Sequence, residues 1–336
     1  MANKAFWGSV KGYPYDDSIA DCDLPDLGAP KMRYPFISKS ITSSAMTVGT
    51  LLATTIGTTT SAGVIRHDVD DALYQQLGQQ SQFASVGSIS INFAGGGGTT
   101  CSGTLIGNGE WILTAAHCVD NGPVSSAIFA NESAFGFVDE VIIHPDWSFN
   151  DFLGGGDIAL LRLSAPITSL QSAEIYAGHD ELGEVGTAVG FGRFGTGLTG
   201  QQPGTGGIRR AGNNVLDVLG TERGWDERIL LTDFDSPLNA NESLYGDEEP
   251  LDLEYSVAPG DSGGGMFIET ADGWQIAGIN SFVNSLDGNP DGDYGDSNGF
   301  TRVSAYAGWI NSIIPAPSTL PMLVMGMMVG TRRNRR

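Results

Sequence analysis

Positive charge is scarce in this chain. Its 336 residues hold 17 Lys and Arg against 39 Asp and Glu, which gives a formal net charge of −22 at pH 7. A surplus of negative charge on this scale repels phosphate backbones and anionic lipid surfaces. We therefore expect no nucleic-acid partner.

Cysteine and long apolar runs are also scarce. The chain has three cysteines, and the sequence shows no thiolate or histidine cluster of the kind that binds zinc. The apolar run 319–330 is shorter than the roughly 20 residues that a membrane-spanning helix needs. It is too short for a permanent anchor unless Ile313 and Ile314 extend it.

Glycine, in contrast, is abundant. The chain has 48 glycines, 40% hydrophobic residues and only 17% charged residues, a balance that favours short strands joined by turns. Between 83 and 313, short apolar runs such as "SVGSISINF", "WILTAAHCV", "DIALLRL" and "GWQIAGINSFV" are separated by Gly, Asn and Asp. This spacing predicts an all-β barrel or sandwich. The glycine-rich segment 192–210 is predicted to be an exposed loop.

One helix is predicted, close to the end of the folded part. The segment "VSAYAGWINSII" places Ala305, Trp309 and Ile313 at helical spacing. We expect a short terminal helix that packs on the body through these three residues.

Both ends of the chain lie outside the predicted fold. Residues 1–31 are interpreted as an extension upstream of a true start at Met32, although a real prosegment would also account for them. Residues 32–63 resemble a secretory signal, with Arg33 and Lys39 ahead of an apolar stretch that ends in small residues. We therefore expect an exported protein that is processed by signal peptidase.

The C-terminal residues 314–336 form a tail. They resemble a PEP-CTERM sorting signal, with a proline-rich tetrad, an apolar segment and an arginine cluster. Ala316 stands where that motif usually has Glu. The resemblance implies a C-terminal sorting enzyme at the cell envelope; the alternative is a tail anchor with a positive cytoplasmic end.

A serine in the glycine-rich stretch "APGDSGGGMF" raises a chemical question. A hydroxyl such as that of Ser262 is a poor nucleophile unless a base, a group that orients the base and oxyanion donors lie nearby. His117 follows an apolar strand in "WILTAAHCV", and Asp157 opens another in "GGGDIALLRL". The other histidines, His67, His144 and His179, have no comparable setting.

Three of these motifs together resemble the trypsin/chymotrypsin family of serine endopeptidases. "LTAAHC", "DIALLRL" and "GDSGG" occur in the family's order, and the resemblance extends over about 230 residues, 83–313. It implies two antiparallel six-stranded β-barrels with a short C-terminal helix, all within a peptidase domain at 64–313. The first barrel is expected at about 80–185 and the second at about 186–313.

The resemblance assigns a role to each residue of the constellation. Ser262 is the expected nucleophile, His117 the general base and then acid, and Asp157 the group that orients the imidazole. The backbone N–H groups of Gly260 and Ser262 are the expected oxyanion hole. Each residue also has a structural alternative: a glycine-rich turn, a core histidine or a strand-edge turn residue.

Two further features come from the same resemblance. "CSGTLI" matches the strand whose cysteine pairs with the one beside the catalytic histidine, so a Cys101–Cys118 disulfide is expected. Asp261 is expected to pair with a newly freed N-terminal ammonium, for which Val64 or Ile65 are the candidates. The family's usual Ile/Val-Val-Gly-Gly start is absent, so activity without zymogen cleavage stays open as an alternative.

The primary specificity pocket is expected to be uncharged. The resemblance places Ser256 at its base, where enzymes that cleave after Arg and Lys have an aspartate. Its walls align with Val283 and Asn298, and a valine there should narrow the pocket toward small or medium apolar side chains. We therefore predict an enzyme that is not specific for basic residues.

An acidic segment, "DGNPDGDYGDSNG", resembles half of a calcium loop. Asp287, Asn289 and Asp291 stand at alternate positions, but Asn298 replaces the glutamate expected at the twelfth position. The alternatives are a structural calcium site and a solvated acidic turn. No cofactor is expected to be required for catalysis.

Taken together, these features predict an exported serine endopeptidase that hydrolyses peptide bonds in a protein or peptide substrate through an acyl-enzyme. The alternative is a catalytically silent binding protein of the same fold at the cell surface. Members of that class usually lose a residue of the catalytic set, whereas this chain keeps His117, Asp157 and Ser262.

Overall fold

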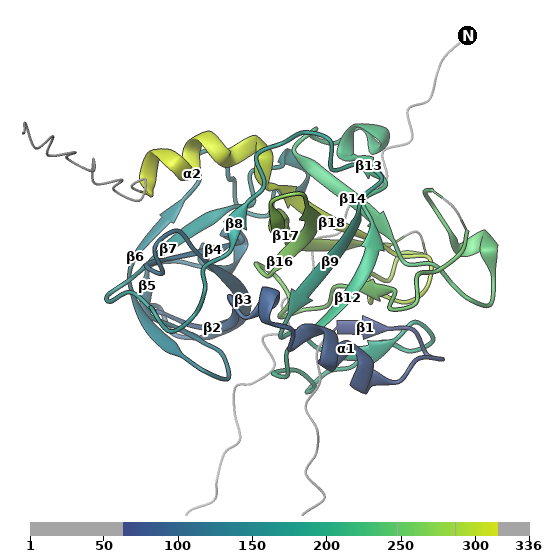
Figure 1. The fold of residues 1–336 in the computed structure, drawn as a ribbon, viewed down its shortest axis with the longest axis horizontal. Coiled ribbons are helices and arrows are strands. Elements are labelled where there is room, and N and C mark those ends of the chain that lie inside the picture. Colours follow the sequence, from purple (N-terminus) through teal and green to yellow (C-terminus); the bar gives the residue numbers. More distant parts are fainter. Residues whose placement is uncertain (1–62, 247, 286, 315–336) are drawn as a thin grey trace, which may run out of the picture. The chain divides into compact units, whose positions relative to one another are not determined.

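Six antiparallel strands in the first half of the described chain close into a barrel (Figure 1). The computed structural model describes residues 63–314, with gaps at 247 and 286; all lie in the compact unit Thr59–Arg336, while the other unit, Met1–Thr58, lies outside the described residues. In barrel order the strands are β2 (Val86–Phe93), β3 (Gly98–Ile106), β4 (Trp111–Thr114), β7 (Ala159–Leu163), β6 (Phe135–Ile143) and β5 (Val124–Ala130). Apolar residues buried on the inside of these strands form the barrel core.

The second half is a half-barrel, a sheet of eight strands. Its order is β12 (Arg210–Val215), β9 (Val185–Gly190), β16 (Gly265–Thr270), β17 (Gly273–Asn284), β18 (Ser297–Arg302), β14 (Ile229–Asp233) and β13 (Val218–Leu219), with β8 (Glu174–Ile175) parallel to β17. Most residues of β9, β14 and β16 are buried. The prediction of an all-β chain with few helices is confirmed.

A small third sheet contains part of the glycine-rich segment 192–210. Its order is β11 (Gly200–Gln201), β10 (Phe194–Thr196), β1 (Gly63–Ile65) and β15 (Tyr255–Ser256). The prediction of an exposed loop was wrong here, since Gly195 and Gly200 are buried. A Cβ on Gly195 would lie 1.9 Å from the carbonyl oxygen of Gly200, so glycine is what allows the two backbones to approach.

Two α-helices lie on this framework. Helix α1 (Asp71–Gly78) was not predicted; Asp70 caps it by accepting a hydrogen bond from the N–H of Ala72. Helix α2 (Ala307–Ile313) is the predicted terminal helix, which follows the 3₁₀ turn η6 (Val303–Tyr306). Of the three residues predicted to pack on the body, Trp309 and Ile313 are partly buried against the core, whereas Ala305 is exposed. The buried residue of the helix itself is Ile310.

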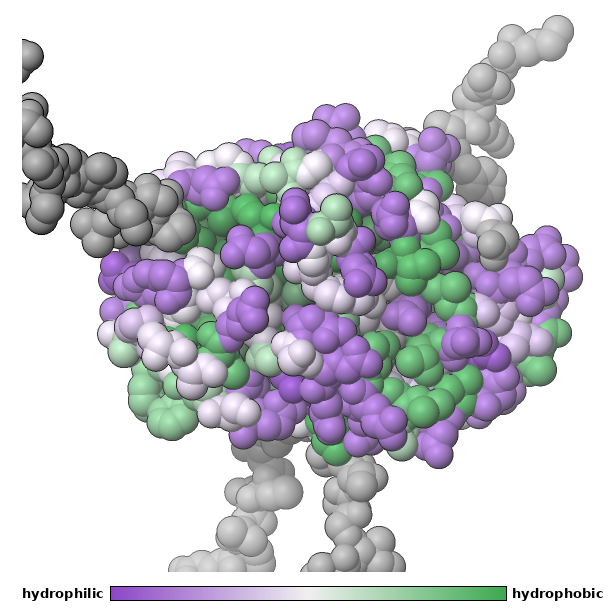
Figure 2. Space-filling model, viewed as in Figure 1, coloured by the Kyte–Doolittle hydropathy of each residue, from purple (hydrophilic) through white to green (hydrophobic). Residues whose placement is uncertain are grey.

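Helix α2 packs beside the first barrel, as Figure 1 shows. The remaining short 3₁₀ turns are η1 (Ser81–Phe83), η2 (Ala116–Cys118), η3 (Phe152–Gly154), η4 (Gly220–Arg223) and η5 (Ala240–Glu242). No helix in the described part of the chain is long and apolar enough to span a membrane. On the face shown in Figure 2, hydrophilic side chains are interspersed with smaller apolar areas.

The two halves are joined through Ser102, a fully buried residue of β3. Its hydroxyl donates to the carbonyl of Gly260 at 2.8 Å and accepts from the N–H of Phe191 at 3.0 Å. Its backbone N–H donates to the carbonyl of Ser262, also at 2.8 Å. One residue of the first barrel therefore fixes the loop of the second half that holds Ser262.

Candidate active site

His117 lies where the buried strand β4 ends and the chain turns into η2. Ala116 and Cys118 on either side are buried, whereas the His117 side chain is 20% exposed. The predicted disulfide between Cys101 and Cys118 is confirmed and ties this turn to β3. His117 is thus held at the surface end of a rigid part of the barrel.

Asp157 precedes β7 and is buried, with 1% of its surface exposed. One carboxylate oxygen lies 2.7 Å from Nδ1 of His117, and the other accepts the backbone N–H of His117 at 2.9 Å. The hydroxyl of Ser281 donates to the first oxygen, while Thr301 Oγ1 donates to the Asp157 carbonyl at 2.8 Å. These contacts hold the imidazole with Nδ1 toward the carboxylate, which leaves Nε2 facing away from it.

The environment moves the pKa values of this pair apart. Burial opposes the charged form of His117, but the negative charge of Asp157 and its hydrogen bond outweigh burial and raise the histidine pKa. Burial also opposes ionisation of Asp157, but His117 and the Ser281 hydroxyl outweigh it and lower the aspartate pKa. At neutral pH the carboxylate is therefore ionised and can stabilise an imidazolium.

Ser262 lies in a turn whose backbone requires glycine at two nearby positions, Gly260 and Gly263. Gly260 and Gly263 have φ angles of 101° and 83°, in the left-handed region that L-residues rarely adopt. A Cβ on Gly263 would also lie 2.0 Å from Thr114 Oγ1. The glycines of "GDSGG" thus bring the Ser262 backbone close to the first barrel.

The structure brings Ser262 and His117 to the same disulfide. Sγ of Cys118 lies 3.7 Å from the carbonyl oxygen of Ser262 and 3.9 Å from Nε2 of His117. The predicted nucleophile, which is partly exposed, and the nitrogen that Asp157 leaves free therefore both lie next to the Cys101–Cys118 disulfide; a hydrogen bond between the Ser262 hydroxyl and Nε2 stays a prediction.

The turn also leaves two N–H groups available. Those of Asp261, Gly263 and Gly264 donate to backbone carbonyls. Within residues 63–314 as described, those of Gly260 and Ser262 have no protein acceptor. They are the two donors that the sequence predicted for the oxyanion hole, and they are free to bind a ligand oxygen.

Asp261 is fully buried next to Ser262. Its carboxylate accepts the N–H of Gly192 at 2.7 Å, the N–H of Ala258 at 2.9 Å and the hydroxyl of Tyr255 at 3.2 Å. Burial raises its pKa to about 6, against these hydrogen bonds, which lower it. The predicted ion pair with a freed N-terminus stays a prediction.

Val64 and Ile65, the candidates for that N-terminus, lie within β1. This strand is parallel to β10 and antiparallel to β15, with Val64 opposite Ser256 and Ile65 opposite Tyr255. In the described chain both residues are therefore paired on two sides.

The three predicted pocket residues lie together. The Ser256 hydroxyl donates to Oδ1 of Asn298 at 2.8 Å, and Asn298 lies opposite Val283 in the β17–β18 ladder. Asn298 also accepts the N–H of Val257 and donates to Thr232 Oγ1. Ser256 and Asn298 are thus buried, uncharged and bonded to each other.

The acidic segment is only partly arranged as predicted. Asp287 accepts the Ser285 hydroxyl and the N–H of Asn289, whose side chain donates to Asp291. The carboxylates that do converge, within 4.8 Å of one another, belong to Asp291, Asp293 and Asp296. Whether calcium binds here stays a prediction.

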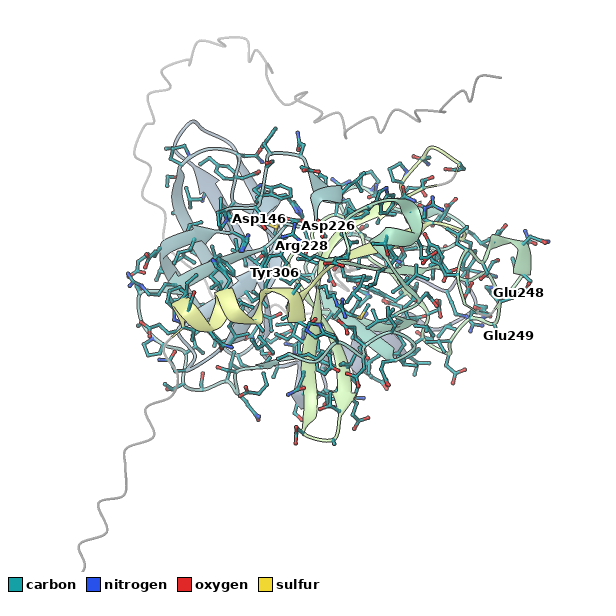
Figure 3. The ribbon with its side chains drawn as sticks, turned by 90° about the horizontal axis from the view of Figure 1, so that it is seen from above. Asp146, Asp226, Arg228, Glu248, Glu249 and Tyr306 are labelled. Carbon is teal, nitrogen blue, oxygen red and sulfur yellow. A yellow bond between two sulfur atoms is a disulfide. The ribbon has the colours of Figure 1, made fainter. Side chains whose placement is uncertain are left out.

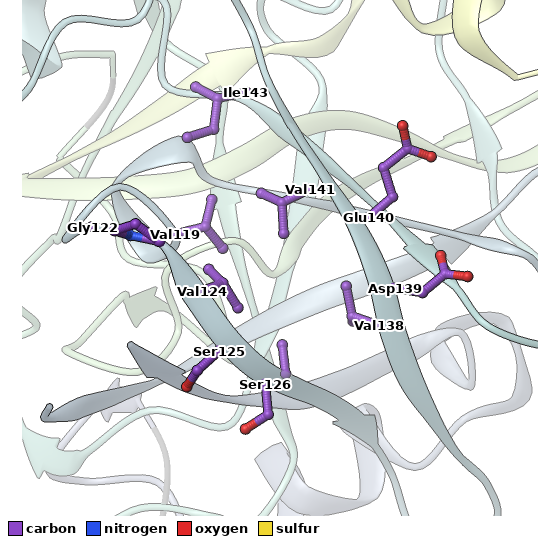
Figure 4. A pocket seen from close by; sticks show the side chains of 12 residues that line it. Val119, Gly122, Val124, Ser125, Ser126, Val138, Asp139, Glu140, Val141 and Ile143 are labelled. Atoms are coloured by element: carbon purple, nitrogen blue, oxygen red, sulfur yellow. The ribbon is translucent and has the colours of Figure 1, made fainter. Parts of the chain in front are cut away.

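A hollow of about 430 Å³ lies elsewhere on the first barrel, between β5 and β6 (Figure 4). Val119, Val124 and Val141 are among its apolar lining residues, and Asp139 and Glu140 lie at its edge. None of the three predicted catalytic residues lines it, so this hollow is separate from the candidate active site.

Three residues that support the site were not singled out from the sequence. Ser281 binds Asp157, Ser102 fixes the Ser262 turn, and Tyr255 binds Asp261. Ser281 stands in the apolar run "GWQIAGINSFV" and Ser102 in "CSGTLI", so the positions of both were usable signals. Tyr255 is an ordinary strand residue whose role becomes visible only in three dimensions.

Comparison with known proteins is consistent with this geometry. The family model described as Trypsin matches residues 77–310. The chain is 30% identical over 243 residues to chymotrypsin-like elastase family member 1 of Canis lupus familiaris, covering 67% of this chain and 86% of that protein. The same protein of Felis catus is 30% identical over 247 residues, covering 67% and 84%.

Solved structures share the fold. HL collagenase is similar with a TM-score of 0.50 and 22% identity, over 69% of this chain and 94% of that one. Neuropsin, a serine protease of mouse brain, is similar with a TM-score of 0.51 and 20% identity, over 70% and 97%. The predicted chymotrypsin-like fold is thereby confirmed, and the chain belongs to the trypsin family of serine proteases.

Proposed function

We propose that this chain is a serine endopeptidase in which Ser262, His117 and Asp157 act as nucleophile, general base and orienting carboxylate. The observation that carries the proposal is the 2.7 Å contact between His117 Nδ1 and the buried Asp157, with Sγ of Cys118 next to both His117 Nε2 and the Ser262 carbonyl. A carboxylate on Nδ1 fixes the neutral tautomer in which Nε2 can accept a proton.

The chemistry follows from these positions. Ser262 Oγ attacks the substrate carbonyl while its proton passes to Nε2 of His117. The N–H groups of Gly260 and Ser262 bind the oxygen that becomes negative. His117 then gives the proton to the leaving amine, and the resulting acyl-enzyme is hydrolysed by water with the same histidine as base.

We propose that the enzyme prefers small to medium apolar side chains before the cleaved bond. An uncharged pocket base offers no partner for Arg or Lys, because Ser256 is already bonded to Asn298. Val283, opposite Asn298, narrows the pocket. Similarity to proteins named chymotrypsin-like elastases supports the same preference.

Fluorophosphonate labelling combined with a peptide-anilide panel tests this function. We expect label on Ser262, located by peptide mapping, and faster cleavage after Ala or Val than after Arg or Lys. Ser262→Ala and His117→Ala should abolish both signals. A folded chain that neither labels nor cleaves would instead favour the catalytically silent binding protein.

We further propose that the protein is exported, after signal peptidase removes residues 32–63 and a sorting enzyme acts on the tail 314–336. Nearly all of these residues lie outside the described part of the chain, so the proposal rests on their sequence. Mass spectrometry of the mature termini tests it. Secreted protein that begins at Met32 and ends at Arg336 would contradict both processing steps.

A further inference from the structure

The carboxylate of Asp261 is the buried charge closest in sequence to the proposed nucleophile. In the described part of the chain its side-chain contacts are two backbone N–H groups and one hydroxyl, without an ion pair. An ionised carboxylate in such a site needs strong hydrogen bonds, since burial alone disfavours its charge. The hydroxyl of Tyr255 is the only side-chain donor among those contacts.

Tyr255 is itself held in a fixed position. Only 2% of its surface is exposed, and its strand β15 is paired with β1. A Cβ on Gly63 would lie 2.0 Å from the Tyr255 hydroxyl, and one on Gly212 would lie 2.3 Å from Tyr255 Cβ. The backbone at Gly63 and at Gly212 therefore restricts the Tyr255 ring to one position, in which its hydroxyl contacts Asp261.

The segment 63–78, which contains β1 and α1, packs against Tyr255 and its neighbours. We call this segment the N-terminal bracket. Tyr74 of α1 is buried, and its hydroxyl donates to the carbonyl of Glu254, next to Tyr255. Asp71 at the start of α1 forms an ion pair with Arg210, which is fully buried in β12. The bracket therefore docks by apolar contact, hydrogen bonding and charge.

We propose that Tyr255 is a positioning residue whose hydroxyl, placed by the intact N-terminal bracket, holds Asp261 and with it the Gly260–Ser262 oxyanion donors, so that no freed chain terminus is needed for activity. This inference rests on the proposed serine endopeptidase function. It resolves the choice left open by the sequence in favour of activity that does not depend on a cleavage before Val64 or Ile65, and therefore not on the proposed removal of residues 32–63.

The pH dependence gives the inference a readout that a purely structural role would not change. The titratable and charged groups facing Asp261 are Tyr255 of β15 and Arg210 of β12, the latter paired with Asp71 of α1. Burial brings the pKa of Asp261 to about 6, and the Tyr255 hydroxyl is one of the groups that lower it. Without that hydroxyl the carboxylate protonates at higher pH and releases its N–H donors.

The experiment compares Tyr255→Phe with a control, Tyr176→Phe. Both keep the ring and remove one hydroxyl that donates to a carboxylate, which is Asp261 for Tyr255 and Asp180, away from the site, for Tyr176. We expect kcat of Tyr255→Phe to fall about 10- to 100-fold, the effect of losing a hydrogen bond to a charged group, with KM within about twofold. The acid limb of its pH–kcat profile should become steeper and move to higher pH, whereas Tyr176→Phe keeps the wild-type profile.

A second measurement needs no variant. The full chain, kept uncut upstream of Gly63, is treated with fluorophosphonate, and its intact mass is recorded. Label on the uncut chain is the expected result. Label that appears only after a cleavage directly before Val64 or Ile65 would overturn the inference. It would not contradict the proposed serine endopeptidase function.

Two other outcomes would also overturn the inference. A Tyr255→Phe profile that matches wild type would overturn the positioning role, even if the uncut chain labels. Absence of label from both the uncut and the cleaved chain would overturn the proposed function, and this inference with it.

Discussion

At the scale of single residues, the proposed chemistry depends on where charge and protons are held around His117. Asp157 is buried and lies within hydrogen-bonding distance of the imidazole at 2.7 Å. Burial opposes the charged form of His117, but the negative charge of Asp157 outweighs it and raises the histidine pKa, so the proposed base becomes neutral only as the pH rises past an ordinary histidine value of about 6.5.

Asp157→Asn tests this charge. We expect kcat to fall by a factor on the order of 10⁴, because the amide no longer selects the productive tautomer. The acid limb of any residual activity should move to lower pH, since the charge that raised the pKa of His117 is gone. A pH–kcat profile measures both effects, and an acid limb that stays in place would show that Asp157 does not set this pKa.

Ser281→Ala tests the residue behind Asp157. Its hydroxyl donates to the carboxylate and helps to lower the aspartate pKa. We expect kcat to fall about tenfold, in line with the loss of one hydrogen bond to a buried charge. Ser88→Ala, which removes a hydroxyl bonded to the Ala130 carbonyl away from the site, is the control. Equal kcat in the two variants would contradict the role given to Ser281.

The sequence pointed to the proposed reacting residues more readily than to their supports. His117, Asp157 and Ser262 stand in recognisable motifs, one of which includes the glycines around Ser262. Tyr255 reaches Asp261 through strand pairings between distant segments, and no local motif marks such a contact. Its role could therefore be found only once the sheets were known.

At the scale of elements, the Cys101–Cys118 disulfide ties the turn that carries His117 to β3. The double variant Cys101→Ser, Cys118→Ser should lose about 3 kcal/mol of unfolding free energy, as expected for a loop of this length. Urea denaturation measures the loss, and a reducing agent added to the wild type should reproduce it. An unchanged midpoint in both experiments would contradict a stabilising role for the bridge.

The acidic segment gives an element-scale prediction about pH. Burial and neighbouring carboxylates raise the pKa of Asp293 to about 6 and that of Asp296 to about 7, above their unfolded values near 3.9. The folded state therefore binds more protons than the unfolded state between about pH 4 and 7, and stability falls as the pH rises through this window. Asp296→Asn should flatten this fall in thermal unfolding scans.

The calcium prediction can be tested in the same scans. Calcium would bind the ionised carboxylates, so adding it in millimolar amounts should raise Tm at pH 8 and have little effect at pH 5. Chelation should reverse the gain. Equal curves with and without calcium at pH 8 would contradict a calcium site at Asp291, Asp293 and Asp296.

Strand prediction succeeded where apolar runs were continuous and failed where glycine was dense. β4 and β7 read as strands because nearly every residue in them is apolar and buried. In 192–210 the glycines indicated a loop, yet the absence of side chains is what lets β10 and β11 pack closely. Helix α1 was missed because its stability comes largely from contacts with β12 and β15, which lie far along the chain.

At the scale of the whole molecule, Arg228 links the two halves near the proposed active site. It forms ion pairs with Asp146 and Asp226, and its guanidinium lies 5.6 Å from the centre of the Tyr306 ring (Figure 3). It also donates to the carbonyl of Gly154 at 2.9 Å, in the loop that leads to Asp157.

Arg228→Ala should therefore reduce both stability and activity. We expect a Tm lower by about 2–4 °C, corresponding to roughly 1 kcal/mol in a domain of this size, and a several-fold lower kcat. Arg162→Ala is the control, because Arg162 is exposed and pairs with Asp139 and Glu140 on one barrel, where such pairs contribute little. Identical behaviour of the two variants would contradict the linking role.

In the proposed mechanism Ser262 forms an acyl-enzyme with the help of His117 and Asp157. The most direct test is a stopped-flow measurement with an activated ester of a small apolar amino acid. We predict a burst of released alcohol close to one equivalent per chain, followed by slower turnover, and no burst from Ser262→Ala. Turnover without a burst that persists in Ser262→Ala would contradict the claim.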